Sequence, residues 1–114
     1  MLSAPHRLRR QKDFDRAYKQ GQRIFGPIFN LIFLKNDLAV SRFGIVVGKK
    51  SEKLATRRNR IKRQLRHLIR ANLARIKPGR DIVISIKANA LAKTYVEMEK
   101  EVYGMLKKAG LLND

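Results

Sequence analysis

Apolar residues recur with the period of an α-helix near both ends of the chain. Within residues 11–20, Phe14 and Tyr18 stand one turn apart and therefore share a side of the helix. Towards the other end, Thr94 and Glu97 form the T-x-x-E pattern of a capping box, which predicts that a helix begins there. The apolar positions that follow keep helical spacing and are typical of core packing: Tyr95, Met98, Val102, Met105, Leu106 and Ala109.

A third amphipathic helix is predicted over residues 56–76. At about 100° per residue, Ile61, Leu65 and Leu68 fall on one side of this helix. One side can therefore pack on a core, while the other presents guanidinium groups, which bind phosphate oxygens in a two-pronged geometry. That other side gathers the polar side chains Asn59, Lys62, Arg63, Arg66 and Arg70.

Alternating branched and aromatic residues predict three β-strands, over residues 28–35, 42–48 and 81–87. A turn around Asn36 and Asp37 separates the first two strands, and so short a connection predicts an antiparallel hairpin. The order helix, two strands, helix, strand, helix indicates an α/β layered fold with a small mixed sheet. The chain has 114 residues, of which 44% are hydrophobic, and it contains no repeat or linker, so a single domain over residues 1–114 is expected.

The balance of charge indicates which class of partner the protein binds. The chain carries 27 Lys and Arg against 9 Asp and Glu, which gives a net charge of +18. Between Lys49 and Arg80 the only acid is Glu52, whereas the last helix is nearly balanced. So large a positive excess costs stability through self-repulsion, and it indicates a polyanionic partner.

Several classes of function leave no trace in the sequence. It has no cysteine, no apolar run long enough to span a bilayer and no signal-peptide pattern, so we expect a cytoplasmic protein without a membrane partner. His6 and His67 are the only histidines, and the carboxylates form no cluster that could hold a metal or share acid–base chemistry. We therefore predict no catalytic residue and no metal site on this chain.

An RNA partner accounts for both the basic helix and the aromatic pair. Phe14 and Tyr18 could stack unpaired bases, which is worth roughly 1–3 kcal/mol per base, or they could pack the first helix on the sheet. Their spacing leaves both readings open. A DNA-reading helix is less well supported, because beyond Asn59 and Gln64 little could read base edges. The candidate RNA contacts are Lys49, Lys50, Arg57, Arg58, Asn59, Arg60, Lys62, Arg63, Arg66 and Arg70.

The same residues resemble a known family. Lys49-Lys50, then Ala55, then the run R-N-R-I-K-R from Arg58 and finally Arg66 are similar to the signature of the protein subunit of bacterial ribonuclease P. The opening R-L-R-R-Q-K-D-F-D-R-A-Y-K-Q-G resembles the first helix of that family with its paired aromatics, and G-R-D-I-V-I-S resembles its later part. The chain departs from the family at residues 51–54, where many members have a glycine, and at His67, where an acid is frequent.

The resemblance implies a fold and a function. The family fold is a two-layer α+β sandwich, similar to domain 2 of ribosomal protein S5. It has a four-stranded mixed sheet, three helices and a left-handed strand–helix–strand crossover. In the family a large catalytic RNA uses Mg²⁺ to remove the 5′ leader of precursor tRNA. The basic helix is associated with that RNA, and a cleft between the first helix and the sheet, with Phe14 and Tyr18 at the matching positions, is associated with the leader.

The expected partners are thus the catalytic RNA and precursor tRNA, with no obligate protein partner. The alternative that the residues leave open is a structural RNA-binding protein of the ribosome, which would carry the same basic helix but act on no substrate.

Overall fold

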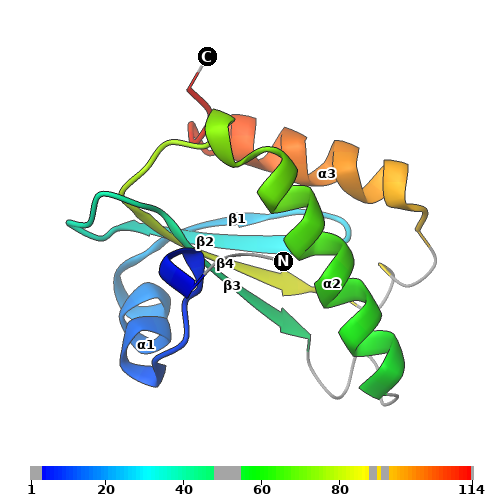
Figure 1. Ribbon diagram of the computed structural model, residues 1–114, viewed down its shortest axis with the longest axis horizontal. Coiled ribbons are helices and arrows are strands. Elements are labelled where there is room, and N and C mark those ends of the chain that lie inside the picture. The colour runs from blue at the N-terminus through cyan, green and yellow to red at the C-terminus, as the bar shows by residue number, and fades with distance from the viewer. Residues whose placement is uncertain (1–3, 48–54, 88–89, 91–92, 114) are drawn as a thin grey trace.

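The computed structural model describes residues 4–47, 55–87, 90 and 93–113. Four strands form one sheet in the order β1-β2-β4-β3, and three α-helices pack on its two faces (Figure 1). The expected α+β class, with a four-stranded mixed sheet and three helices, is confirmed. The strands are β1 (Gln22–Phe25), β2 (Phe29–Lys35), β3 (Arg42–Val47) and β4 (Arg80–Ile86). The α-helices are α1 (Gln11–Gln20), α2 (Ala55–Ala71) and α3 (Tyr95–Lys108), and the 3₁₀ turns are η1 (Ala4–His6) and η2 (Leu73–Arg75).

The predicted hairpin between β2 and β3 is wrong, because β4 lies between these two strands. β4 pairs antiparallel with β2 and parallel with β3. Ile82, Val83 and Ile84 are at most 2% exposed, and a strand buried on both faces belongs in the centre of a sheet. The polar side chains of the connecting loop stabilise this arrangement. The amide Nδ2 of Asn36 donates to Asp81 Oδ1 at 2.9 Å, and Ser41 Oγ donates to the carbonyl of Lys77 at 2.6 Å.

The hairpin that the structure contains joins β1 and β2 and was not predicted. Its turn is closed by the N–H of Gly26, which donates to the carbonyl of Phe29 at 2.9 Å. β1 is a short edge strand whose residues are exposed except for the half-buried Ile24. Such a strand shows little alternation, and so the hydrophobic pattern did not reveal it.

The crossover from β3 through α2 to β4 connects two parallel neighbours. Viewed from the α2 side with both strands pointing up, β4 lies to the left of β3 (Figure 1). The crossover is therefore left-handed, as the resemblance implied, although such connections are right-handed in most proteins.

The two faces of the sheet carry separate apolar clusters. On one face, α2 and α3 pack against alternate residues of the strands, including Phe29, Leu31 and Ile84. On the other face, α1 covers a smaller cluster made of Leu8, Ala17, Ile32 and Val83, with Phe14 and Val46 at its edge. Figure 1 shows α1 on the side of the sheet away from α2. The main core therefore fixes the orientation of α2, whereas the apolar cluster beneath α1 is small.

The basic helix is shorter than predicted, since α2 ends at Ala71. The side chain of Asn72 donates through Nδ2 to the carbonyl of Leu68 at 2.8 Å, and such a side-chain bond competes with a further helical turn. The turn η2 follows, and Ile76 is 4% exposed in extended backbone rather than in a helix. The capping box at the start of α3 is confirmed, because Thr94 and Glu97 exchange both of its hydrogen bonds. Among the described residues, no helix is long and apolar enough to cross a lipid bilayer.

Candidate nucleic-acid interface

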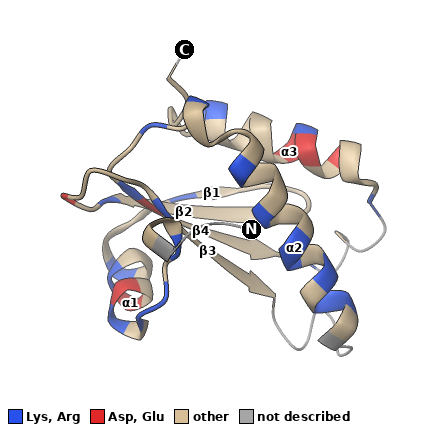
Figure 2. Cartoon of the chain, in the orientation of Figure 1, with Lys and Arg blue, Asp and Glu red and all other residues tan. Residues whose placement is uncertain are grey.

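Among the described helices and strands, α2 carries the most Lys and Arg. Ile61, Leu65 and Leu68 are at most 4% exposed, so the apolar side of α2 faces the sheet and fixes the rotation of the helix. Lys and Arg then follow one another along the rest of its surface (Figure 2). This arrangement agrees with the amphipathic division predicted from the sequence, because a regular helix places residues on its faces by spacing alone.

Two hollows flank α2, so its polar side chains point in more than one direction. A shallow groove is lined by Thr56, Asn59, Arg63 and Arg66. On the flank that faces the start of α3 there is a cavity of about 330 Å³. The sequence did not reveal the second hollow, since Lys93 joins it from a distant segment. The cavity is lined by Arg57, Arg60, Ile61, Gln64, Ala90 and Lys93.

The accessibility of the predicted RNA contacts varies along the helix. Arg57, Asn59, Arg60, Arg63 and Arg70 are exposed, whereas Arg58, Lys62 and Arg66 are half-buried. Within the described part of the chain, no ion pair engages Arg60, Arg63 or Arg66. No described acid therefore compensates their charges, which suits an anionic partner. The predicted contacts Lys49 and Lys50 lie outside the described residues.

The opposite face of the sheet has an open strip beside α1. Cross-strand pairing places Phe25, Asn30, Ser85 and Val46 in one row across β1, β2, β4 and β3. The side chains of this row are half-buried, apart from Phe25, which is 71% exposed. In the next row, which α1 covers, Ile32 and Val83 are at most 4% exposed. The strip therefore offers a polar floor with an aromatic ring at the β1 end.

The aromatic pair of α1 is divided by its surroundings. Phe14 is half-buried against the small cluster, and a Cβ built on Gly44 would lie 2.6 Å from its ring. Tyr18 is 36% exposed. The shared helix face predicted from spacing is present, but its two rings differ in access to solvent. Base stacking by this pair stays a prediction, for which Tyr18 is the more accessible ring.

Asn30 is a candidate contact that the sequence did not single out. Its Oδ1 is buried and has no hydrogen-bond partner among the described residues. A buried amide oxygen without a partner is unfavourable, so the floor of the open strip has an unsatisfied hydrogen-bonding group. The only sequence signal was a polar residue near the start of a largely apolar strand.

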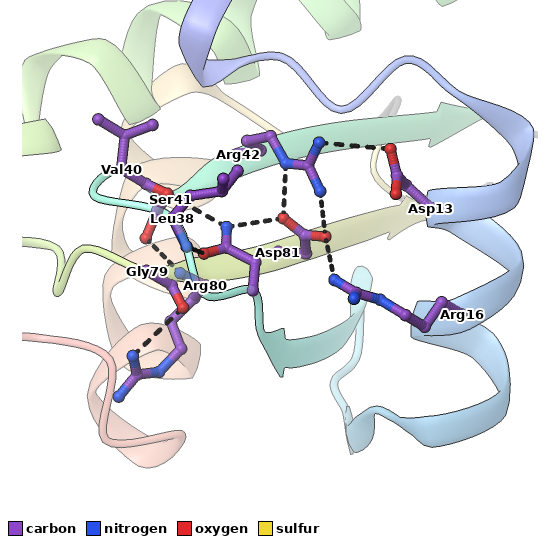
Figure 3. A network of polar contacts seen from close by, with 10 residues as sticks. Asp13, Arg16, Leu38, Val40, Ser41, Arg42, Gly79, Arg80 and Asp81 are labelled. Carbon is purple, nitrogen blue, oxygen red and sulfur yellow. Dashed lines mark hydrogen bonds and ion pairs between the residues drawn. The ribbon is translucent and has the colours of Figure 1, made fainter.

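A buried carboxylate joins α1 to the sheet. Asp81, at 0% exposure in β4, accepts from Arg42 Nε at 2.8 Å and from Arg42 Nη2 at 2.7 Å (Figure 3). Two residues of α1 complete the network, since Arg16 Nη2 lies 3.3 Å from Asp81 Oδ2 and Arg42 Nη1 lies 3.3 Å from Asp13 Oδ2. The hydrogen bonds to Asp81 raise the pKa of Arg42 above its ordinary value, and the nearby negative charges add to this against the opposing effect of burial.

No cluster of three His, Asp or Glu side chains that could hold a metal ion occurs within the described residues. The carboxylates of Asp13 and Asp81 are engaged by arginines. The arrangement is that of a binding surface with two faces: a cationic helix on one side of the sheet and a half-open strip with exposed aromatic rings on the other.

Comparisons with known proteins agree on one family. The family model described as Ribonuclease P matches residues 2–110. The ribonuclease P protein component of a Synechococcus species is 40% identical, over 98% of this chain and 87% of the relative. That of a Pseudanabaena species is also 40% identical, over 99% of this chain and 98% of the relative.

Solved structures agree with the sequence comparisons. The RNase P protein from Staphylococcus aureus superposes with a TM-score of 0.87 at 28% identity, covering 95% of this chain and 98% of that one. The RNase P protein from Thermotoga maritima superposes with a TM-score of 0.82 at 33% identity, covering 90% of this chain and 96% of that one.

Proposed function

Because the chain belongs to the ribonuclease P protein family, we propose that it is the protein component of a ribonuclease P holoenzyme, which removes the 5′ leader from precursor tRNA. The family resemblance drawn from the R-N-R-I-K-R run and the first helix is confirmed. The alternative, a structural protein of the ribosome, is not favoured, since the relatives and the solved structures agree on ribonuclease P.

The observation that carries this proposal is the uncompensated cationic side of α2. Arg60, Arg63 and Arg66 have no ion-pair partner among the described residues. Arg63 and Arg66 line the groove beside α2, and Arg60 lines the cavity on its other flank. The apolar side of the same helix is packed in the main core. Guanidinium groups spread along a helix in this way suit the phosphates of a folded RNA, and the counterions that they displace contribute to affinity. We assign this side to the catalytic RNA subunit.

The strip beside α1 supports a second RNA contact. Phe25 in the strip and Tyr18 on α1, which packs on the same face, have exposed rings, and Asn30 and Ser85 form part of the floor of the strip. Aromatic rings stack unpaired bases with little sequence preference, as a single-stranded leader requires. Because α1 and α2 lie on opposite faces of the sheet, the protein could hold the leader while it is bound to the catalytic RNA.

We assign the chemical step to the RNA subunit, which in this proposal uses Mg²⁺. The residues of this chain bind and orient RNA: the α2 cations reduce the repulsion between two polyanions, and the strip holds the leader in place. We place the protein in the cytoplasm, which suits a chain without cysteine.

The test is cleavage of precursor tRNA by the cognate catalytic RNA at low Mg²⁺, with and without this protein. We expect the protein to raise the cleavage rate, and we expect a variant with Arg60, Arg63 and Arg66 changed to Ala to raise it much less. A matched control changes Arg9, Arg75 and Lys108, which are exposed and lie outside α2, to Ala. No stimulation by the wild-type protein, or equal stimulation by both variants, would contradict the proposal.

A further inference from the structure

α1 is held to the sheet by few apolar contacts. Ala17 is its only fully buried residue, and the cluster beneath it is small. At its C-terminal end, Gly21 comes so close to β2 that a Cβ there would lie 2.8 Å from Ile32 Cγ2, and Arg23 Nη2 donates to the carbonyl of Tyr18 at 2.6 Å. The body of the helix therefore depends on other contacts for its position.

Those contacts are the two ion pairs that α1 makes with the network around Asp81. Arg42 is the shared element, because it holds Asp81 through Nε and Nη2 and turns Nη1 towards Asp13. Asn36 Nδ2 donates to Asp81 as well, so the buried carboxylate is fixed without any help from α1. Asp13 and Arg16 thus attach α1 to a rigid charged centre in the sheet (Figure 3).

Asp13 and Arg16 belong to the same helix as the aromatic rings of Phe14 and Tyr18. Asp13 directly precedes Phe14, and Arg16 is two residues before Tyr18 on the same helix. A small rotation or shift of α1 would therefore move both rings relative to the row that contains Asn30 and Ser85. We propose that Asp13 and Arg16 are positioning residues that fix α1, and with it the rings, for leader binding. This inference rests on the leader-binding role proposed above.

The decisive variant is Asp13→Asn, because the loss of a negative charge and the loosening of α1 have opposite expected effects on RNA affinity. Removing an acid from a protein that binds a polyanion should strengthen binding to every RNA. Loosening α1 should instead weaken binding of the leader alone. Asp15→Asn is the matched control, because it makes the same change of charge on the same helix. Among the described residues, the carboxylate of Asp15 hydrogen-bonds only to Gln11 of α1, which donates through Nε2 at 3.0 Å.

We would reconstitute the holoenzyme and measure its affinity for precursor tRNA and for mature tRNA, which lacks the leader. Asp13→Asn should lower the affinity for precursor tRNA by about three- to tenfold, without weakening the binding of mature tRNA. A factor of that size corresponds to the free energy of one partly buried ion pair. Asp15→Asn should leave the ratio of the two affinities at its wild-type value. The same ratio for Asp13→Asn and Asp15→Asn, or an equal loss for both RNAs, would overturn the inference.

Arg16 needs a further measurement, because a half-exposed arginine could also touch a phosphate directly. Arg16→Gln should lower the precursor-to-mature ratio without changing its salt dependence, and Arg16→Lys should restore most of it. Loss of a direct contact would instead reduce the log–log salt slope by roughly 0.7, and that result would overturn the positioning role of Arg16. Lys19→Gln, which removes the same charge from an exposed site of α1, is the control.

Two readouts separate this inference from the proposal beneath it. If the wild-type holoenzyme binds precursor and mature tRNA equally well, the leader-binding role itself is wrong. If the wild type prefers precursor tRNA and Asp13→Asn keeps that preference, only the positioning role is wrong. A melting curve for each variant shows whether the protein is folded. Asp13 and Arg16 are the positions changed, because Asp81→Asn would disturb the buried centre of the network.

Discussion

At the scale of single residues, neighbours in the helix pattern have different surroundings in the fold. Phe14 and Tyr18 share a side of α1, yet Phe14 packs over Gly44 while Tyr18 keeps 36% of its surface exposed. Arg58 and Arg63 belong to the same basic run, yet Arg58 is half-buried and Arg63 is exposed in the groove. Mutations at these four positions therefore have different expected results.

Tyr18→Ala should weaken binding of precursor tRNA by the holoenzyme about tenfold, since a stacked base contributes roughly 1–3 kcal/mol. Mature tRNA should bind as before, and the melting temperature should fall less than in Phe14→Ala because Tyr18 is the more exposed residue. Phe14→Ala should lower the free energy of unfolding by up to about 3 kcal/mol, the lower end for a fully buried Phe, and weaken leader binding as well. Parallel losses of mature tRNA binding in Tyr18→Ala would argue against stacking on the leader.

Arg63→Ala should reduce the magnitude of the log–log salt slope for binding of the catalytic RNA by roughly 0.7–0.9, the value for one lost phosphate contact. The measurement is a titration at several salt concentrations. Arg75→Ala, which removes the same charge from the exposed turn η2, serves as the comparison. If the two variants give the same slope, Arg63 is only solvated.

At the scale of elements, α3 contains a glycine whose replacement is expected to raise the stability of the protein without touching the proposed RNA-binding surfaces. Gly104 lies inside α3, and a Cβ added there would meet nothing within 4 Å. Glycine in a helix costs roughly 0.5–1 kcal/mol relative to alanine because the unfolded chain has more freedom. Gly44 in β3 is the opposite case, since an added Cβ would lie 2.6 Å from the ring of Phe14.

Gly104→Ala should accordingly raise the free energy of unfolding by about 0.5–1 kcal/mol, measured by urea denaturation, with no change in RNA binding. Gly44→Ala should lower it, because either the ring of Phe14 or β3 has to move. A destabilised Gly104→Ala protein would mean that α3 has a contact on that side that the described residues do not provide.

The capping box of α3 predicts a dependence on pH. A hydrogen bond from the backbone N–H of Thr94, with a smaller contribution from its side chain, lowers the pKa of Glu97. A carboxyl whose pKa is lower in the folded state contributes stability above its unfolded pKa and loses it as the pH falls through the folded value. The difference in melting temperature between wild type and Glu97→Gln should therefore be constant from neutral pH to about 5 and fade below that. A difference that grew on acidification would contradict this assignment.

At the scale of the whole molecule, charge sets the conditions under which the protein works. With a net charge of +18, the positive side chains repel one another and lower the stability of the folded state. An RNA that binds only the folded state stabilises that state by mass action. The acids that could help to cleave RNA are few, and the buried Asp81 is held by Arg42, Arg16 and Asn36. The carboxylate of Asp81 is therefore engaged in holding the fold together.

The protein alone, incubated with precursor tRNA and Mg²⁺, should leave the RNA intact until the catalytic RNA is added. Gel analysis of the 5′ end measures this directly. A preparation in which Arg60, Arg63 and Arg66 are changed to Ala controls for a contaminating nuclease, since such an activity would not depend on these residues. Specific removal of the leader by the RNA-free protein would refute the assignment of chemistry to the RNA subunit.

Local patterns determined the three helices and the cationic side of α2. The spacing of Ile61, Leu65 and Leu68 decides which side of α2 is buried, and the remaining positions then face outward wherever the helix docks. The same reasoning placed the capping box at Thr94. These features depend on residues within a few turns of one another, and a sequence reports such relations directly.

Only the tertiary structure decided the strand order, the edge strand β1 and the network around Asp81. The short connection between β2 and β3 predicted a hairpin, but these strands do not pair because β4, which is buried on both faces, lies between them. That competition for burial involves strands some forty residues apart, and the resulting register brings Asp13, Arg16, Arg42 and Asp81 together. The sequence by itself determined which surfaces are apolar and which are charged, because period and composition are local. The fold decided which distant side chains meet, because that depends on how the strands share one core.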